Sequence, residues 1–347
     1  MAYSTINKPT EHFNTVLYTG NGSTQSITGV GFQPDFTWIK ARNGATNYYH
    51  YLQDSVRGSL KVLFSNNNDS ENVYTQSVTS FDSDGFTTGS QAATNDNGDN
   101  FVSWNWKGGG TASSNTDGSV TSSVSANATA GFSIVKWSST TNATDTVGHG
   151  LSSAPELIHT KILASGDWAS HTSAIDGSWD YFRINTTAGG GNSSHTAATN
   201  SVFSFNQGSV ANFISYCYHS VKGYSKIGQF TSIGNDDGRF VYTGFKPALV
   251  MIKPNVTDGW SNWYVFDSKR DHAQLNDGPL YWNLTTLEGY YGGSPSSNYS
   301  QIDLLSNGFK IRRDGNWGAG GSGQQCLYYA VAAQPLVGTN NVAATAF

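Results

Sequence analysis

Charged residues are scarce in this sequence of 347 residues. Asp, Glu, Lys and Arg make up only 12% of it, about half of the ~25% that is usual in soluble domains. The net charge is −5, and the longest basic groups are the pairs Lys269-Arg270 and Arg312-Arg313. Because a phosphate-binding surface needs clustered Lys and Arg, the sequence predicts no nucleic-acid partner.

Long apolar runs and helical periodicity are also missing. No run approaches the ~20 apolar residues that span a bilayer, and the segment from Met1 to Pro9 lacks the apolar core of a signal peptide. We therefore expect no membrane insertion and a protein that is soluble when made. No window of about 12 residues keeps a 3.6-residue period, so any helix should be a single turn in a loop.

The patterns that mark catalytic and metal sites are absent as well. The eight histidines show no His-x-x-x-His spacing, and there is no Cys-x-x-Cys pair. The segment Gly318 to Gly323 has Gly and Ser at the wrong spacing for a nucleophile elbow, so we interpret it as a loop. The sequence thus predicts no metal, no cofactor and no enzymatic activity.

Aromatic residues and neutral polar residues are what the chain has in abundance. Aromatics reach 13%, and Ser, Thr, Asn, Gln and Gly must solvate the surface. This mixture suits β-structure on the outside of a cell or particle, and it suits contact with carbohydrate. The alternative is that the rings mostly fill β-sheet cores.

One segment recurs three times and organises the chain. It runs from Gly244 to Lys253, with copies from Gly31 to Lys40 and, two residues longer, from Gly150 to Lys161. In each copy Gly and Pro shape a turn, an apolar run enters a core, and we expect the final Lys to lie at the surface.

Each unit also closes on an aromatic strand, at Phe101–Trp106, Phe213–Tyr218 and Cys326–Val331. When the last two are superposed, Cys326 aligns with Phe213, and Cys217 aligns with Ala330. We therefore expect both cysteines to be small buried hydrophobic residues without a disulfide, which fits assembly in a reducing cytoplasm.

These landmarks predict an all-β fold of three tandem antiparallel β-sandwich modules with a jelly-roll-like form. The predicted boundaries are module 1 at 1–110, a Ser/Thr/Gly-rich linker at 111–130, module 2 at 131–223, module 3 at 224–335 and a tail at 336–347. The linker could flex, although residues 120–124 could pair as an edge strand. Because residues 221–225 are so short a connection, we expect modules 2 and 3 to pack at a fixed angle and module 1 to be freer.

Two carboxylate patterns each have a functional and a structural interpretation. Asp82-Ser83-Asp84-Gly85 resembles the start of a calcium loop, but a hairpin turn explains it better. Asp54, Asp176 and Asp267 take comparable places after the organising segment. A repeated carboxylate is more often one that caps a turn than a catalytic acid.

Aromatic residues near turns and strand ends are the binding candidates. An exposed ring can stack on a sugar while nearby Asn, Gln and Asp bind its hydroxyls; the alternative is packing between domains or subunits. The candidates are Trp104, Trp106, Tyr48, Tyr49, Trp260, Trp263, Tyr290 and Tyr291.

Several of these motifs resemble those of repeat-containing virion proteins of tailed bacteriophages from marine bacteria, which are often described as tail-fibre-like. The resemblance covers nearly the whole chain. It rests on Phe13 to Gly22, Phe81 to Phe86, Trp104 to Gly109, Tyr216 to Lys226 and Ala330 to Thr339.

The resemblance implies a virion component, assembled in the host cytoplasm, that contacts other virion proteins and forms a homo-oligomer, with a trimer favoured. We expect an appendage or adhesin that contacts a host surface polysaccharide. Only about a dozen residues precede the strand at Phe13 with which module 1 begins, and no heptads occur, which favours a compact adhesin, an adaptor-bound module or a capsid decoration. The alternatives are a decoration or connector protein without a receptor role and, third, a polysaccharide depolymerase.

Overall fold

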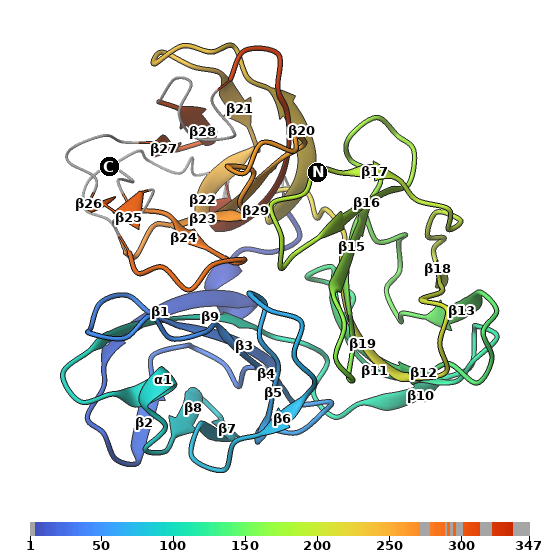
Figure 1. The fold of residues 1–347 in the computed structure, drawn as a ribbon, viewed down its shortest axis with the longest axis horizontal. Helices are drawn as coiled ribbons and strands as arrows, with labels where there is room; N and C mark the ends of the chain where they lie inside the picture. The colour runs from blue at the N-terminus through green and yellow to red at the C-terminus, as the bar shows by residue number, and fades with distance from the viewer. Residues whose placement is uncertain are drawn as a thin grey trace.

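The computed structural model describes residues 4–270, 278–288, 290–291, 294–295, 301–312 and 321–335. The fold is all-β and its strand ladders in these ranges are antiparallel, which confirms the predicted class (Figure 1). The helices in these ranges are single turns, η1 at Pro9–Glu11 and α1 at Ala92–Asn95. The prediction of short helices in loops is therefore confirmed.

The strands gather into three lobes around a common centre (Figure 1). The first lobe has a four-stranded sheet in the order β1-β9-β3-β4, backed by a β2-β8-β7 sheet and a β5-β6 pair. Its strands are β1 Phe13–Thr19, β2 Gln25–Thr28, β3 Phe36–Ala41, β4 Tyr51–Asp54, β5 Lys61–Val62, β6 Asn72–Val73, β7 Val78–Asp82, β8 Gly85–Thr88 and β9 Asn100–Trp106.

The second lobe has an eight-stranded sheet in the order β10-β11-β12-β19-β14-β15-β16-β17, backed by the β13-β18 pair. Its strands are β10 Ser113–Asn115, β11 Ser122–Asn127, β12 Phe132–Ser138, β13 Asp145–Gly148, β14 Leu157–Ile162, β15 Trp168–Thr172, β16 Asp180–Arg183, β17 Gly191–Asn192, β18 Val202–Phe205 and β19 Asn212–Tyr218.

The third lobe has a five-stranded sheet in the order β20-β29-β22-β23-β24, with a β21-β28-β27 sheet and a β25-β26 pair. Its strands are β20 Ser225–Thr231, β21 Phe240–Tyr242, β22 Phe245–Pro254, β23 Tyr264–Asp267, β24 Leu280–Tyr281, β25 Tyr290–Tyr291, β26 Ser294–Pro295, β27 Ile302–Leu305, β28 Gly308–Ile311 and β29 Gln325–Pro335.

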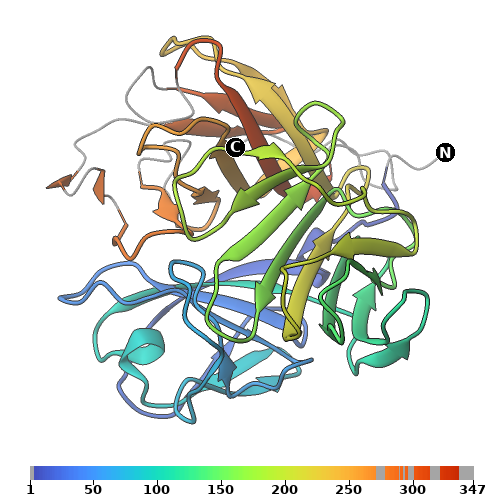
Figure 2. The same cartoon turned by 45° about the vertical axis from the view of Figure 1, so that its right-hand side comes forward.

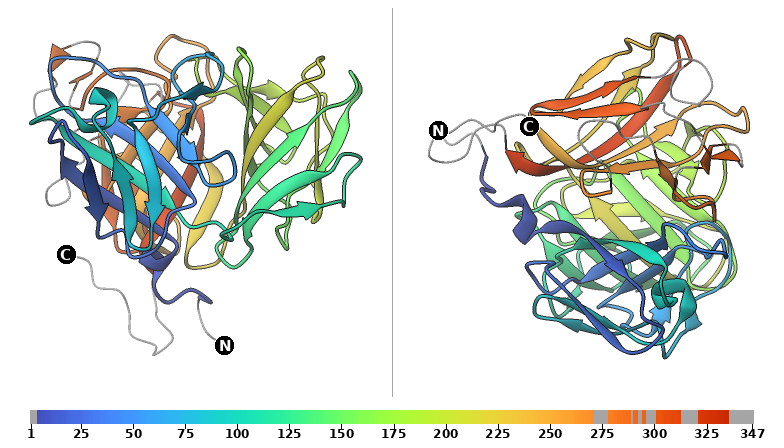
Figure 3. Two further views of the ribbon diagram at one scale, coloured as in Figure 1. Left: turned by 90° about the horizontal axis from the view of Figure 1, so that it is seen from below. Right: turned by 90° about the vertical axis from the view of Figure 1, so that its left-hand side faces the viewer.

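The largest sheet of each lobe is covered on both faces. Its outer face packs against the smaller sheet of its own lobe, which gives each lobe a separate core. Its inner face contributes to one hydrophobic cluster that the three lobes share, which we call the central cluster. The lobes therefore group about a centre and do not follow one another in a line, as Figures 2 and 3 show from other sides.

Aromatic rings from different lobes meet in the central cluster. Phe36 stacks on Tyr216 with ring centroids 4.3 Å apart, which joins the first and second lobes. Trp38 and Trp282 join the first and third at 4.1 Å, and Tyr218 and Tyr329 join the second and third at 5.0 Å. The expectation that the first module is freer than the others is therefore wrong, because its inner face is buried against both.

The predicted linker also belongs to a sheet. β11 pairs with β12 and β10 pairs with β11, so both extend the sheet of the second lobe; the sequence left such pairing open for residues 120–124. Just before them, the Asp35 carboxylate accepts hydrogen bonds from the N–H groups of Gly108 at 2.8 Å and Gly110 at 3.3 Å. The segment is thus held at both ends.

The strand registers align the three lobes residue by residue. The pairs Phe36↔Trp106, Leu157↔Tyr218 and Leu249↔Val331 each join the organising strand to the closing strand. Counting two residues back places Trp104, Tyr216 and Tyr329 at one shared position. Counting one residue back from Tyr218 and Val331 aligns Cys217 with Ala330, and counting five back aligns Phe213 with Cys326, as predicted. Both cysteines are buried. The division into three modules, with its boundaries, stays a prediction that this common register supports.

Candidate functional site

Three of the predicted binding residues are buried. Trp104, Trp106 and Trp263 are at most 1% exposed, because they lie on the inner faces of their sheets, in the central cluster. Their indole N–H groups donate to other lobes: Trp104 to Asp267 at 2.9 Å, Trp106 to the Tyr329 hydroxyl at 3.4 Å, and Trp263 to the Arg183 carbonyl at 2.9 Å. The expectation that these rings meet a sugar is wrong. These rings pack between domains, which is the alternative that the sequence left open.

The remaining candidates lie elsewhere. Tyr49 is 43% exposed and Trp260 is 49% exposed. Tyr48 is partly buried and donates from its hydroxyl to Asp96 at 2.8 Å. The two tyrosines precede β4 in the first lobe, whereas Trp260 lies between β22 and β23 in the third. The side chains of Tyr290 and Tyr291, on β25, lie outside the described residues.

The repeated carboxylates have the predicted structural role. Asp54 accepts the backbone N–H of Arg57 at 2.8 Å and pairs with its guanidinium at 2.5 Å. Asp267 does the same for Arg270, at 3.0 Å and 2.5 Å. Both pairs are buried.

Asp176 is not the third member of this set. Register places Thr172 opposite Leu157, where Asp54 lies opposite Phe36 and Asp267 opposite Leu249. Three residues later the second lobe has Ile175, which belongs to the central cluster, in place of the arginine. Asp176 is exposed and accepts a turn hydrogen bond from the Ser178 N–H at 2.8 Å. The predicted equivalence is therefore wrong, because Asp176 lies four residues beyond the equivalent position, Thr172.

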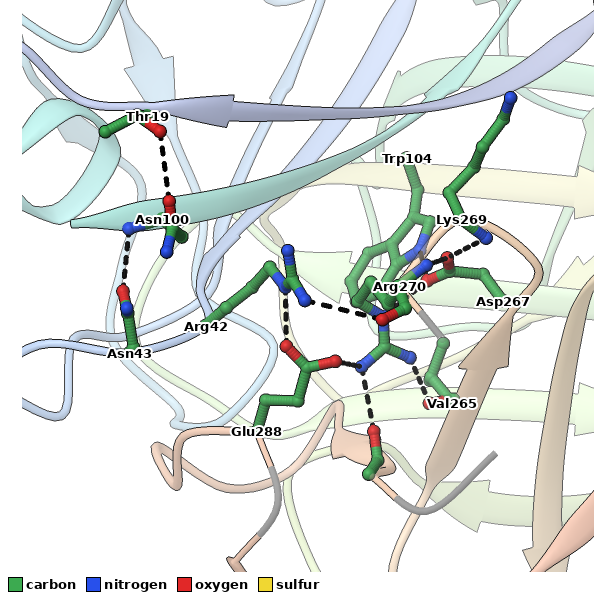
Figure 4. Close-up of polar contacts among 11 residues, drawn as sticks. Thr19, Arg42, Asn43, Asn100, Trp104, Val265, Asp267, Lys269, Arg270 and Glu288 are labelled. Carbon is green, nitrogen blue, oxygen red and sulfur yellow. Dashed lines mark hydrogen bonds and ion pairs between the residues drawn. The ribbon is translucent and has the colours of Figure 1, made fainter. Parts of the chain in front are cut away.

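An ion-pair network joins the first and third lobes (Figure 4). Glu288 pairs with Arg42 at 2.5 Å and with Arg270 at 3.5 Å. The guanidinium of Arg270 lies 5.7 Å from the centre of the Trp104 ring. These contacts make the network a clamp between lobes, and its charges are already paired.

The three lysines that end the organising segments are buried, not at the surface as predicted. Lys40, Lys161 and Lys253 are 0% exposed. Their ammonium groups donate to backbone carbonyls: Lys40 to Thr285 at 3.0 Å, Lys161 to Ile162 at 2.7 Å, and Lys253 to Ser261. Burial lowers the pKa of Lys40 and of Lys253 to about 7, and that of Lys161 to about 8.

The Asp82–Gly85 segment is the hairpin turn between β7 and β8, as predicted, with Gly85 at φ +146°. Its carboxylates bind protein groups, since Asp82 accepts from Thr87 at 2.7 Å and Asp84 from the Gly31 N–H at 2.6 Å. Within the described ranges, no group of three His, Cys, Asp or Glu side chains could hold a metal ion.

A cleft in the second lobe brings together chemistry that the sequence did not single out. It has a volume of about 390 Å³, within the roughly 300–1,000 Å³ of small-ligand sites. It lies between the β15–β17 end of the large sheet and β18. Its lining is Asp167, Ala169, His171, Tyr181, Arg183, Asn192, Ser193, Ser194, His195, Phe205, Asn206 and Gln207.

Four rings shape the cleft. His171 on β15 is 2% exposed and contacts the rings of Tyr181 at 5.4 Å and His195 at 5.2 Å. His195 in turn stacks on Phe205 at 5.5 Å, with 9° between the planes. His171 and Phe205 are buried, whereas Tyr181 and His195 are partly exposed.

Hydrogen bonds fix the polar side chains around these rings. The Nε2 atom of His195 accepts from the Asn206 N–H at 2.9 Å, and its Nδ1 atom lies 3.1 Å from the Ser193 hydroxyl. Arg183 pairs with Asp167 at 3.2 Å and donates to the Tyr181 hydroxyl at 2.8 Å.

Both imidazoles of the cleft are neutral at neutral pH. Burial, with a contribution from nearby His195, lowers the pKa of His171 to about 3. Burial also lowers the pKa of His195. The Nε2 atom of His171 has no hydrogen-bond partner among the described residues. The cleft therefore contains one ion pair, two neutral imidazoles and several amides and hydroxyls.

Sequence reasoning missed the cleft because its residues are spread over positions 167 to 207 without a diagnostic spacing. One signal was present. Tyr181 and Arg183 flank the core residue Phe182 on β16, and Tyr181 lies opposite His171 on β15, so polar and aromatic groups share one sheet face.

The structure is thus an all-β protein with a hydrophobic core shared by three lobes and a small polar and aromatic cleft. The chain belongs to the family described as a domain of unknown function, DUF7483, whose model matches residues 8–335. No curated protein and no solved structure matched it. None of the helices in the described residues has the length and apolar character to cross a membrane.

Proposed function

We propose that this protein is a structural component of a tailed-bacteriophage virion, a tail-fibre-like appendage or adhesin that binds a host surface glycan in the second-lobe cleft. The sequence resemblance supports the phage assignment, and the cleft supports the binding role. We also propose that its three lobes are copies of one β-sandwich unit, that it contacts other virion proteins, and that it forms a homo-oligomer, with a trimer favoured.

The observation that carries the binding role is the composition of the cleft. Partly exposed Tyr181 and His195 offer ring surfaces, while Asn192, Asn206 and Gln207 offer amides. Sugars combine apolar ring faces with hydroxyls, so they need both kinds of group.

The common core supports a mechanical role. An appendage transmits force between the particle and the host, and lobes joined by a continuous hydrophobic cluster cannot hinge freely. The ion-pair clamp of Arg42, Glu288 and Arg270 adds a second connection between the first and third lobes.

A depolymerase role has less support. Glycoside hydrolysis uses two carboxyl groups about 5–10 Å apart across the scissile bond. Asp167 is the one carboxyl group in the described lining of the cleft, and it is paired with Arg183. We therefore propose binding without catalysis.

A connector or decoration role is the second candidate. It is favoured by Phe240 and Tyr242, which are 41% and 48% exposed on β21, at the edge of the small sheet of the third lobe. Exposed rings on an edge strand suit a protein partner.

A glycan array with the purified protein separates these roles. We expect the wild type to bind a subset of bacterial surface glycans, Tyr181→Ala to lose that binding, and Tyr49→Ala, a matched exposed tyrosine of the first lobe, to keep it. Absence of glycan binding by the wild type, with loss of particle attachment in a Phe240→Ser/Tyr242→Ser variant, would favour the connector role.

A further inference from the structure

We propose that the second-lobe cleft binds a neutral pyranose through two adjacent hydroxyl groups, which the Asp167–Arg183 pair recognises. This inference rests on the proposed glycan-binding function and adds the chemical class of the sugar and the residues that select it.

The ion pair has the geometry for such recognition. The Asp167 Oδ2 and Arg183 Nη1 atoms are 3.2 Å apart, and the two side chains are 33% and 47% exposed, so both can be reached by a ligand. A carboxylate only accepts hydrogen bonds and a guanidinium only donates them, whereas each sugar hydroxyl can do both. Two neighbouring hydroxyls can therefore bind side by side, one mainly donating to Asp167 and the other mainly accepting from Arg183.

The pair is already held in place by other side chains. The Nδ2 atom of Asn185 donates to Asp167 Oδ1 at 2.9 Å. The Nε atom of Arg183 donates to the Tyr181 hydroxyl at 2.8 Å, and that guanidinium lies 6.0 Å from the Tyr181 ring centre. Because these contacts restrict both side chains before a ligand arrives, less conformational entropy is lost on binding.

The rings next to the pair suit the rest of the sugar. Tyr181 and His195 are partly exposed, and each contacts the buried ring of His171 between them. Their surfaces can cover the C–H face of a pyranose. The Nε2 atom of His171, which has no partner among the described residues, is a further group that a hydroxyl or a water molecule can satisfy.

The charges of the cleft favour a neutral sugar over an acidic one. Arg183 is the one cation in the described lining, and Asp167 already balances it. A uronic acid or a sulfated sugar would bring its anion next to Asp167, and the like charges would repel. A neutral sugar makes the same hydroxyl contacts without that repulsion.

The test is calorimetric titration of the purified chain with methyl glycosides. The neutral panel is methyl mannoside, galactoside and glucoside; the acidic probe is methyl glucuronide, and the deoxygenated probes are the 2-deoxy analogues. We expect at least one neutral glycoside to bind, removal of one of its adjacent hydroxyls to weaken it by about ten-fold or more, and Asp167→Ala and Arg183→Gln to do the same. Asp176→Ala, an exposed carboxylate of the same lobe, is the control and should bind as the wild type does.

Distinct results overturn the two proposals. Binding of the glucuronide alone, or neutral binding that Asp167→Ala leaves unchanged, overturns this inference but leaves glycan binding standing. Failure of the wild type to bind both these probes and an intact host polysaccharide overturns the proposed function itself.

Discussion

The hydroxyl of Tyr216 donates a 2.7 Å hydrogen bond to the carboxylate of Asp54, so a strand of the second lobe is tied to one of the first. The same position of the closing strand in the first lobe is Trp104, whose indole donates to Asp267 of the third lobe at 2.9 Å. Each of these carboxylates also pairs with its own arginine. The second lobe thus donates to the first, and the first lobe donates to the third, from the same position of the closing strand.

The third member of this set has a different chemistry. The equivalent closing-strand residue in the third lobe is Tyr329, and the position that would supply a carboxylate is Thr172. The Tyr329 hydroxyl instead accepts a 3.4 Å hydrogen bond from Trp106. The second lobe, which lacks the Asp–Arg pair, is also the lobe that carries the cleft.

The first prediction concerns Tyr216. Replacing it with Phe removes a hydrogen bond to a buried charge, so the free energy of unfolding should fall by about 1.5–3 kcal/mol. The matched control is Tyr329→Phe, which removes only the long, uncharged contact and should lower it by less. Urea unfolding followed by tryptophan fluorescence measures both, and equal losses would contradict the proposed difference.

The second prediction concerns the buried Asp54–Arg57 pair, because the second lobe has Thr172 and Ile175 at the two equivalent positions. Arg57→Ile alone leaves the buried Asp54 charge unpaired, which should cost about 3–5 kcal/mol. Asp54→Thr/Arg57→Ile, which copies Thr172 and Ile175, removes both charges and should cost less than the single change. Thermal unfolding in a double-mutant cycle tests this, and a double variant less stable than Arg57→Ile would contradict it.

The third prediction concerns the buried lysines. Because the folded state lowers the pKa of Lys40 and Lys253 to about 7 and the unfolded chain binds their protons up to about 10.4, the unfolded state binds more protons between these values. Stability should therefore rise with pH across this window, by up to about 1.4 kcal/mol per pH unit for each lysine.

A neutral replacement isolates this effect. Lys40→Met keeps much of the side-chain volume and removes the titration, so the slope of unfolding free energy between pH 7 and about 10 should decrease. Lys107→Met, at an exposed lysine, is the control. An unchanged slope in Lys40→Met would mean that the Lys40 ammonium is not desolvated.

The fourth prediction concerns the stability of the fold at acidic pH. Burial lowers the pKa of His159 and of His171 to about 3, whereas both titrate near 6.5 when unfolded. The unfolded state takes up these protons first, so stability should fall as the pH drops from about 6.5 toward 3. Asp180, whose pKa burial raises to about 6, opposes this trend between about 6 and 4. In melting curves between pH 4 and 7, His171→Phe should show a weaker dependence than the wild type, and equal dependence would contradict the prediction.

Much of the fold could be predicted because it depends on local patterns. Gly-Pro turns and alternating apolar residues fixed the organising and closing strands, and their spacing gave the alignment of Cys217 with Ala330. Asp82–Gly85 could be assigned to a hairpin because the same turn chemistry recurs at Asn307-Gly308, between β27 and β28.

What could not be predicted depends on how the lobes pack together. A sheet covered on one face would expose Trp104 and Trp106, and only the central cluster buries that face. Lys40, Lys161 and Lys253 are the next-to-last residues of their strands, where a lysine normally reaches water, and here backbone carbonyls accept hydrogen bonds from their ammonium groups. The cleft could not be predicted for a different reason, because β16 and β18 are distant in the sequence and come together only within the folded second lobe.

Glycan binding in the cleft is tested most directly by a structure of the protein bound to a fragment of the host surface polysaccharide, determined by crystallography or on the intact particle by cryo-electron microscopy. We predict a sugar ring in the second-lobe cleft, against Tyr181 and within hydrogen-bond distance of Asp167 and Arg183. A glycan bound instead at Tyr49 or Trp260, with the cleft empty, would contradict it.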